Sequence, residues 1–252
     1  MFSSLRQTEE KRYDSAANNE KSAFEAGTLE SGIENFPSEH TPPFLEYYFQ
    51  IGKNVSQGQL VLEIGIGTGR HSHPVLEAGG NLTGLDVSEN ALNLCKLRHP
   101  SAMVIRGSME TLPFDDSTFD VVVSCASLSY GNFSLVSSEI SRVLKKGGSL
   151  IVLDSLNHNP VYRFNRYVNF LRGKRTRKTL ENMPDLKRIR IFSEKFESHS
   201  EFYFGTYLWI QALFAAVGLK NLGLRITSFL KKRFPSDKNA FKFVLVARKL
   251  LK

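Results

Sequence analysis

The stretch VLEIGIGTGR, residues 61 to 70, decides the fold of this chain. It contains an apolar run, an acid at Glu63 and three glycines at alternate positions, Gly65, Gly67 and Gly69. Alternate glycines adopt backbone conformations that a Cβ forbids, and they let a ligand lie directly against the chain. The pattern predicts a strand, a tight turn and a helix over residues 69–78 whose start points at the ligand.

The spacing of these glycines differs from that of the dinucleotide-binding fingerprint. That fingerprint requires a third glycine at position 70, where this chain has Arg70. Glu63 suits a cationic amino-acid group better than a phosphate. A second acid, Asp86, ends the next predicted strand in LTGLDV (residues 82–87), where a carboxylate can accept both hydroxyls of a ribose.

These two motifs are followed by GSMETLPF (residues 107–114) and RVLKKGG (residues 142–148). In this order, over roughly residues 58 to 154, they resemble the class I S-adenosylmethionine-dependent methyltransferases, in the small-molecule branch that includes quinone-biosynthesis methyltransferases. The resemblance implies S-adenosylmethionine as cofactor. It also implies an α/β, Rossmann-like, doubly wound sheet of seven strands, mostly parallel, with the last strand antiparallel beside the fifth.

The resemblance further implies which residues hold the cofactor. Helices before the first strand, within residues 1–55, are expected to cover it as a lid; a partly ordered leader is the alternative for this segment. Ser108 stands where the family usually has an acid, so its hydroxyl or nearby backbone groups are expected to hold the adenine amino group. The expected cofactor-binding residues are Tyr13, Glu63, Gly65, Ile66, Gly67, Gly69, Asp86, Val87, Ser108, Met109 and Cys125.

The remaining elements follow from periodicity and from start and stop signals. Proline at positions 42 and 43 suits the first turn of a helix, and Ser88 is a natural N-cap. We predict helices over residues 41–51, 88–97, 134–146 and 200–217, with the third stopped by Gly147 and Gly148. We predict further strands over residues 102–106, 119–125, 149–154, 222–227 and 241–247.

Composition favours one domain over residues 1–252. A chain of 252 residues that is 41% hydrophobic can bury one sizeable core. It has no apolar run long enough to span a membrane, and its first residues lack the pattern of a secretory signal, so a cytoplasmic location is expected. Cys95 and Cys125 are expected to be buried free thiols.

No metal site is expected from the sequence. His71 and His73 would face different sides of a helix, so solvated or packing roles are favoured for them. Asp115 and Asp116 stand next to Ser117 and Thr118, which is typical of a solvated turn.

An insertion at residues 156–199 carries most of the positive charge. Between Arg163 and Arg190 there are ten Lys or Arg and two acids, an excess equal to the net charge of +8 of the whole chain. Aromatic residues such as Tyr162 and Phe164 alternate with these cations. The segment is expected to be a helical cap that either is simply solvated or faces an anion: a phosphate, a lipid headgroup surface, a nucleic acid or an anionic sugar donor.

Methyl transfer to oxygen requires a group that takes a proton. In an open α/β sheet ligands bind at the carboxyl ends of the strands. Tyr130, after the fourth strand, and His158, after the fifth, satisfy this placement and are the predicted catalytic residues, His158 ahead of Tyr130 because imidazole titrates near neutrality. His40, His199 and Glu34 are reserve candidates.

The sequence therefore predicts a methyltransferase that acts without metal on a small molecule, at an oxygen of a sugar or glycan-linked acceptor that carries phosphate. The alternatives are a lipophilic quinone- or lipid-like acceptor reached at the membrane surface through the basic cap, or a non-catalytic cofactor-binding protein. An RNA-modifying enzyme is disfavoured, since the chain lacks the Asn/Asp-Pro-Pro-Tyr/Phe run typical of methyltransferases acting on nucleobase amino groups.

Overall fold

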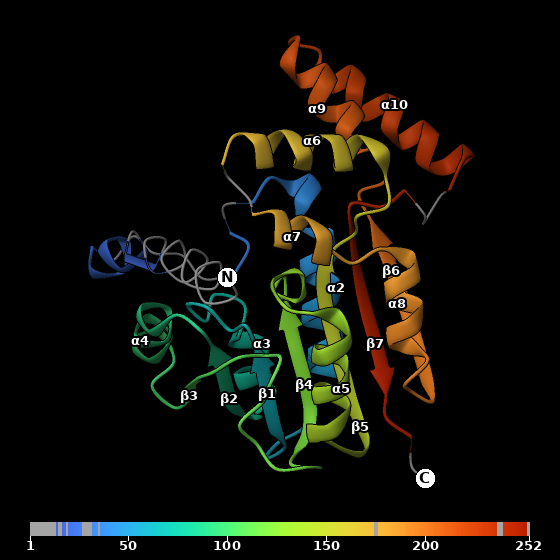
Figure 1. Cartoon of the computed structure of the whole chain (residues 1–252). Coiled ribbons are helices and arrows are strands. Elements are labelled where there is room, and N and C mark those ends of the chain that lie inside the picture. Colours follow the sequence, from blue (N-terminus) through green and yellow to red (C-terminus); the bar gives the residue numbers. More distant parts are fainter. Residues whose placement is uncertain are drawn as a thin grey trace.

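A seven-stranded sheet forms the centre of the computed structural model, which describes residues 14, 17–18, 20–26, 32–34, 36–173, 176–235 and 239–250 (Figure 1). The strand order is β3-β2-β1-β4-β5-β7-β6. Strands β1 to β5 pair in parallel, whereas β7 is antiparallel to both β5 and β6. The predicted Rossmann-like sheet, with its last strand antiparallel beside the fifth, is confirmed. The strands are β1 Leu60–Ile64, β2 Asn81–Asp86, β3 Met103–Arg106, β4 Phe119–Cys125, β5 Leu144–Ser155, β6 Ser198–Phe204 and β7 Lys242–Arg248.

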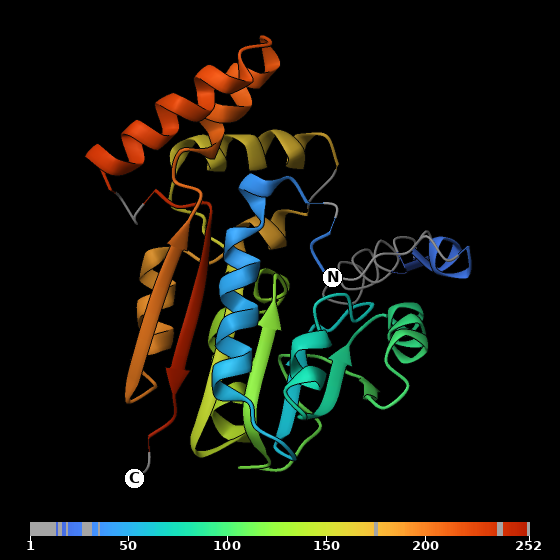
Figure 2. The ribbon, with the colours of Figure 1, turned by 180° about the vertical axis from the view of Figure 1, so that it is seen from behind.

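Helices cover both faces of this sheet. Figure 1 shows α5 and α8 on one face, and Figure 2 shows α2 on the other. Alternate residues of the central strands therefore enter two separate cores: Leu62 and Val122 pack with the first group, and Val61 and Val123 with the second. The helices are η1 Ser38–His40, α2 Pro42–Asn54, α3 His73–Glu77, α4 Glu89–Arg98, η2 Leu128–Tyr130, α5 Phe133–Val143, α6 Pro160–Leu171, α7 Arg177–Asn182, α8 Leu186–Ser193, α9 Leu208–Ala216 and α10 Lys220–Arg233.

Helix α2 confirms the predicted helix at residues 41–51 and continues to Asn54. Phe44, Tyr47 and Ile51, spaced three and four residues apart, form a buried stripe against the sheet. This part of residues 1–55 is therefore a core helix on a sheet face rather than part of a lid. Tyr13, the predicted lid residue, lies outside the described residues.

Two predicted helix boundaries are wrong, both because of glycines. Gly69 has a φ of +73°, so the turn continues and the helix predicted over residues 69–78 shrinks to α3. Helix α5 ends at Val143, and β5 runs through Gly147 and Gly148. A Cβ at Gly148 would lie 2.9 Å from the carbonyl oxygen of Asp120 on β4, so this glycine serves strand packing rather than helix termination.

Between the insertion and β7 the prediction is wrong over two segments. Residues 198–204 form the edge strand β6 rather than helix, because they pair with β7 along their whole length. The predicted strand at residues 222–227 lies inside helix α10. Gly223 explains the difference: a Cβ there would lie 2.7 Å from the Cβ of Phe214, so the glycine lets α10 approach α9 closely.

The insertion at residues 156–199 is helical, as expected, and contains α6, α7 and α8, but α8 packs on a face of the sheet rather than in a cap. Together with the α9–α10 hairpin, α6 lies beyond the carboxyl ends of the parallel strands, at the end of the molecule opposite the C-terminus (Figure 1, Figure 2). Among the helices of the described ranges, none has the length and apolarity needed to cross a bilayer.

Candidate active site

The turn after β1 leaves space for a ligand at one glycine. Gly65, Gly67 and Gly69 have φ angles of +67°, +55° and +73°. A Cβ at Gly65 would lie 2.4 Å from the Cβ of Ser127, so protein atoms fill that side. At Gly67 a Cβ would meet no described atom within 4 Å. The backbone at Gly67 therefore offers a surface on which a ligand can lie directly, as predicted for this turn.

Asp86 connects this turn to the end of β2. Its Oδ2 accepts the N–H of Gly67 at 2.9 Å, and its Oδ1 accepts the N–H of Ser88 at 3.0 Å. Burial raises the pKa of this carboxyl above its ordinary value. Because a carboxylate has about four acceptor positions, each oxygen retains one for a hydroxyl donor. Asp86 can therefore accept both hydroxyls of a ribose without releasing its backbone partners.

Glu63 is the buried acid of this site. It lies in β1, opposite Gly84 of β2 and Val123 of β4. Its Oε2 accepts the hydroxyl of Ser72 at 2.6 Å. Burial raises the pKa of the Glu63 carboxyl to about 7. A cation bound nearby would stabilise the ionised form, so the acid is suited to a positively charged ligand group.

The loop after β4 closes the other side of the site. Ser127 donates its hydroxyl to the carbonyl of Ile64 at 2.9 Å, which joins the ends of β4 and β1. Asp154, at the end of β5, is buried and accepts the N–H of Leu128 at 2.9 Å. No role was predicted for Asp154 from the sequence. The same sequence pattern was present, however, because an acid lies at the end of a central parallel strand here just as Asp86 does in β2.

Met109 lies beside this loop, and Ser108 precedes it in the chain. The side chain of Met109 approaches within 4 Å the positions that a Cβ would take at Gly65 and at Gly131, so it bridges the two turns. Ser108 already accepts the N–H of Glu110 at 3.2 Å through its hydroxyl. Its predicted contact with an adenine therefore stays a prediction.

The other expected cofactor residues differ in their surroundings. Ile66 is buried and packs against Gly84, so only its backbone can face a ligand. Val87 uses its carbonyl to accept Arg106 Nε at 3.1 Å. Cys125 ends β4 as a free thiol, and burial raises its pKa. Cys95 is free and buried, as predicted, whereas Cys125 is free but only partly buried.

Part of the segment before α2 contacts this site. Glu20 accepts the hydroxyl of Thr68 at 2.7 Å, and Asp14 accepts that of Ser88 at 2.5 Å. Thr68 belongs to the glycine turn, and Ser88 follows Asp86 as the N-cap of α4. These described residues therefore lie across both turns, which is the arrangement expected of a lid.

The predicted bases lie at the expected edge of the sheet. Tyr130 is the last residue of η2 after β4, and His158 is exposed in the loop after β5. Among the reserve candidates, His199 lies near the start of β6 opposite Ala247, at the amino ends of the parallel strands. Its position excludes His199 from a site at the carboxyl ends.

A cavity of about 310 Å³ lies at the same edge of the sheet, above β6 and β7. Aromatic and aliphatic side chains form most of its wall, and His40, from the reserve candidates, is part of it. Lys242 lies at this cavity with its ammonium 5.1 Å from the ring centre of Phe44. The lining residues include Tyr203, Phe204, Tyr207, Leu208, Lys231 and Phe241. The cavity suits an apolar ligand with a polar or anionic group.

His71 and His73 belong to an aromatic cluster. The Tyr48 hydroxyl lies 2.6 Å from His71 Nδ1, and the His71 ring stacks on Phe44 with centroids 4.9 Å apart. Burial lowers the pKa of His71 to about 3, so its imidazole is neutral. The His73 ring meets Tyr48 edge-on at 4.8 Å. The predicted packing role is confirmed for both histidines.

Several cations of the insertion hold the cap together. Arg166 is buried and donates to the carbonyl of Leu156 at 2.7 Å. Arg188 donates to the carbonyl of Met183 at 2.8 Å. Other cations form ion pairs, namely Arg177 with Glu181, Arg190 with Glu194 and Lys178 with Glu110. Much of the charge that predicted an anion-binding cap therefore has structural partners.

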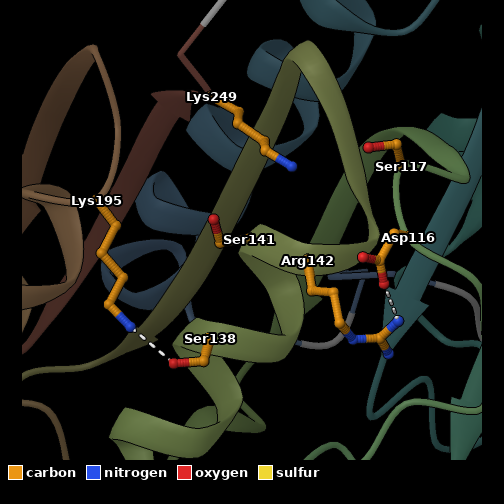
Figure 3. A pocket seen from close by; sticks show the side chains of 7 residues that line it. All are labelled: Asp116, Ser117, Ser138, Ser141, Arg142, Lys195 and Lys249. Carbon is orange, nitrogen blue, oxygen red and sulfur yellow. Dashed lines mark hydrogen bonds and ion pairs between the residues drawn. The ribbon is translucent and has the colours of Figure 1, made fainter. Parts of the chain in front are cut away.

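A second hollow, of about 570 Å³, lies at the amino ends of the strands (Figure 3). Its charged groups already have partners: Lys195 donates to Ser138 at 2.9 Å, and Arg142 pairs with Asp116 at 2.8 Å. Asp115 and Asp116 form an exposed turn, as predicted. No group of acids, histidines and cysteines in the described ranges could hold a metal ion.

Comparison with known proteins agrees with this geometry. Residues 62–152 match the family described as methyltransferase domain. Over 114 residues the chain is 38% identical to phthiotriol/phenolphthiotriol dimycocerosates methyltransferase 1 of Mycobacterium ulcerans, covering 41% of this chain and 40% of that protein. Over 128 residues it is 31% identical to malonyl-[acyl-carrier protein] O-methyltransferase of Buchnera aphidicola, covering 50% and 51%. The chain thus matches only about half or less of the length of these curated relatives.

The fold also matches solved structures. Phosphoethanolamine N-methyltransferase 2 of Haemonchus contortus, solved with S-adenosylmethionine, superposes with a TM-score of 0.58 at 19% identity, over 82% of this chain and 52% of that one. This likeness supports the fold, and the match at residues 62–152 identifies the part that carries the glycine turn, Asp86 and β4. Residues 62–152 therefore match the methyltransferase domain family, and the predicted resemblance to the class I S-adenosylmethionine-dependent methyltransferases is confirmed.

Proposed function

We propose that this protein transfers a methyl group from S-adenosylmethionine to a small-molecule acceptor. The observation that carries the proposal is the open surface at Gly67, bordered by the carboxylate of Asp86 and by the buried Glu63. Asp86 has acceptor capacity for a ribose, and Glu63 would face the positive end of the ligand. The sequence family and the fold support the same reading.

The cofactor would supply an activated methyl group on a sulfonium, so the protein mainly positions the acceptor and excludes water. Glu20 contacts Thr68 and Asp14 contacts Ser88, and these contacts would help to exclude water from the two turns. When the acceptor atom is oxygen, its proton must pass to a base. His158 and Tyr130 stay the predicted groups, and His40 is an imidazole at the cavity wall.

We infer that the acceptor is elongated and lipophilic. The cavity lies above β6 and β7, whereas the methyl donor would lie above β1 and β4. Neighbouring strands are about 4.8 Å apart, so β4 and β7 are separated by about 10 Å along the sheet edge. An acceptor with its reactive group near β4 and an apolar tail in the aromatic cavity would span this distance. Methyltransferases named for phthiotriol lipids are among the similar proteins.

The predicted sugar oxygen is a less supported acceptor. It was inferred from phosphate binding by the basic insertion, and several of those cations have structural partners. A sugar linked to a lipid would still satisfy the cavity. A test of acceptors must therefore include free sugar phosphates, lipid-linked sugars and quinone-like molecules.

Calorimetric titration tests the cofactor first. S-adenosylmethionine and S-adenosylhomocysteine should both bind, and Asp86→Ala should weaken both roughly a hundredfold, because hydrogen bonds to a charged group are worth about 1.5–3 kcal/mol each. Asp116→Ala is the matched control, since this acid is exposed at the opposite end of the strands. No binding, or a preference for NADH, would refute the proposal.

Transfer of a labelled methyl group to the three acceptor classes tests the second step. Labelled product from the quinone-like or lipid-linked acceptors, with none from free sugar phosphates, is the expected result. Tight binding of the cofactor without transfer to any acceptor would instead support the non-catalytic alternative.

A further inference from the structure

The α9–α10 hairpin exposes an unusual amount of apolar surface. Helix α9 has the sequence LWIQALFAA, in which Gln211 is the one polar residue, yet none of its residues is buried. In α10 only Gly223 and Thr227 are buried. Helix α10 contacts α9 through the side that carries Gly223 and Thr227, where Gln211 of α9 donates to the hydroxyl of Thr227 at 2.8 Å. A helix that is apolar all round is normally buried, so this hairpin presents a surface that something else covers.

Helix α6 extends this surface. Its residues Phe164, Tyr167 and Leu171, spaced three and four apart, are 68%, 52% and 65% exposed. They lie on the side opposite the buried Tyr162. The Tyr162 hydroxyl donates to the carbonyl of Gly205 at 2.6 Å and accepts the N–H of Trp209 at 3.3 Å, which ties α6 to the start of α9. The three helices lie together at one end of the molecule (Figure 1, Figure 2).

The charges on α6 and on the hairpin have a single sign. Residues 208–235 contain five Lys or Arg and no acid, and residues 160–173 contain three Arg, one of them the buried Arg166, and no acid. The acid Glu39 of η1 lies beside α10 in the wall of the cavity. On α10 the residues Leu222, Arg225, Phe229 and Lys232 share one face, because they are spaced three, four and three apart. All four are exposed. Apolar and cationic side chains therefore alternate along the same face, which is typical of helices that lie in a membrane interface.

We propose that α6 and the α9–α10 hairpin form a docking surface for an anionic lipid membrane. The apolar side chains enter the boundary between headgroups and acyl chains, and the cations meet lipid phosphates. A second copy of the chain is a poorer occupant, because it would place two exclusively cationic surfaces in contact. A nucleic acid would pair with the cations but leave Phe229 and Leu213 in water.

The docking surface has a consequence for the acceptor, which rests on the proposed function. Thr227, Ser228 and Lys231 of α10 form part of the wall of the 310 Å³ cavity. A membrane seated on the hairpin is therefore separated from this cavity by the thickness of α10, and a lipid-borne acceptor would pass around this helix to enter it. The docking surface itself is independent of catalysis and is tested separately.

Trp209 provides a direct readout, since it is the single tryptophan of the chain and lies in α9. We expect its fluorescence to shift to the blue on addition of phosphatidylcholine vesicles that contain phosphatidylglycerol, and the protein to sediment with them. Vesicles of phosphatidylcholine alone should bind it more weakly, and high salt should abolish the difference. A protein that stays in the supernatant with the anionic vesicles, without a spectral shift, would overturn the proposal.

Two double variants separate the parts of the surface. Arg225→Gln with Lys232→Gln should weaken vesicle binding roughly thirtyfold, because each cation near an anionic surface contributes about 1 kcal/mol. The matched control is Lys53→Gln with Lys146→Gln, which removes the same charge from exposed positions at the opposite end of the strands. This control should bind like the wild type.

The apolar part is tested with Leu222→Ser and Phe229→Ser together, which should weaken binding roughly tenfold or more. Leu97→Ser with Met103→Thr is its control, at exposed positions on α4 and β3. Unchanged melting temperatures and cofactor affinities would show that the variants fold. Equal binding by surface and control variants would overturn the proposal. Two further results would overturn it. One is a wild-type dimer, seen in sedimentation velocity, that the hairpin substitutions convert to a monomer. The other is binding of the wild-type protein to RNA, and not to vesicles, through the same residues.

Discussion

The hydroxyl of Ser72 donates a 2.6 Å hydrogen bond to the carboxylate of Glu63, an acid that is otherwise enclosed by the sheet. Burial raises the pKa of Glu63 to about 7 from an ordinary value of 4.5. The free protein therefore holds a proton here at mildly acidic pH. A bound cation lowers this pKa, so cofactor binding and proton release are coupled.

Cofactor affinity is consequently expected to rise with pH up to about 7 and then level off. Below about pH 7, calorimetry in two buffers of different ionisation enthalpy should detect the release of up to one proton on cofactor binding. Glu63→Gln should weaken binding roughly tenfold to a hundredfold, because a charged partner is lost. It should also abolish the pH dependence. Glu77→Gln, at an exposed position on α3, is the control and should retain it.

The same group affects the stability of the free protein. Because the pKa of Glu63 is higher in the folded than in the unfolded chain, its contribution to stability falls as pH rises from about 4.5 to about 7. Glu63→Gln lacks this loss and should be more stable than the wild type at pH 8, by up to roughly 3 kcal/mol. Urea unfolding at pH 5 and pH 8 measures the difference. A variant that is destabilised equally at both pH values would contradict it.

A methyl group at Gly67 is expected to block the cofactor. Gly67→Ala places its Cβ in the open space above the turn, and its φ of +55° adds strain of about 1–2 kcal/mol. Gly58→Ala is a matched control, with a φ of +79° and equally open surroundings, in the turn before β1. Both variants should lose similar stability on thermal unfolding. Cofactor affinity should fall more than tenfold in Gly67→Ala alone; a parallel fall in both would mean that strain is the cause.

Two carboxylates should differ strongly in their contribution to stability. Asp154→Ala leaves the buried amides of Leu128 and Ser155 without their acceptor and should cost about 2–4 kcal/mol. Asp116→Ala breaks an exposed pair with Arg142 and should cost less than about 1 kcal/mol. Denaturant unfolding of both variants measures the contrast. Equal losses would show that Asp154 does not anchor the loop after β4.

The predicted base can be identified from the kinetics of single variants. His158→Gln should lower kcat about 10²–10⁴-fold and leave KM nearly unchanged. His40→Gln should mainly raise KM, because His40 lies in the cavity wall. The reverse pattern would assign the proton transfer to His40 instead. Loss of activity in Tyr130→Phe alone would point to the phenol.

The central sheet was predictable because its strands carry local signals. Buried parallel strands are near-continuous apolar runs, and both 61–64 and 119–125 have this form, interrupted only by Glu63, Asp120 and Ser124. The candidate cofactor-binding residues could be proposed from the sequence for a related reason. Gly67 and Asp86 belong to short motifs at strand ends, where the conformation of a few residues determines what can bind.

The remaining features depend on contacts between distant residues. The bond from Leu128 to Asp154 joins η2 to β5, and the pairing of β6 with β7 connects segments on either side of the hairpin. No local pattern distinguishes the segment at residues 222–227 from a strand. The role of Gly223 becomes visible only from its contact with Phe214 on the neighbouring helix α9. The 310 Å³ cavity likewise depends on contacts between distant residues, because its wall comes from four separate parts of the chain.

The insertion of β7 between β5 and β6 sets the order in which the sheet can be completed. When β6 leaves the ribosome, its only neighbour in the sheet has not yet been synthesised, and the α9–α10 hairpin emerges before that neighbour does. An unpaired edge rich in aromatic residues is exposed to aggregation during this interval. The far edge of the sheet therefore closes only after residue 248 has been translated.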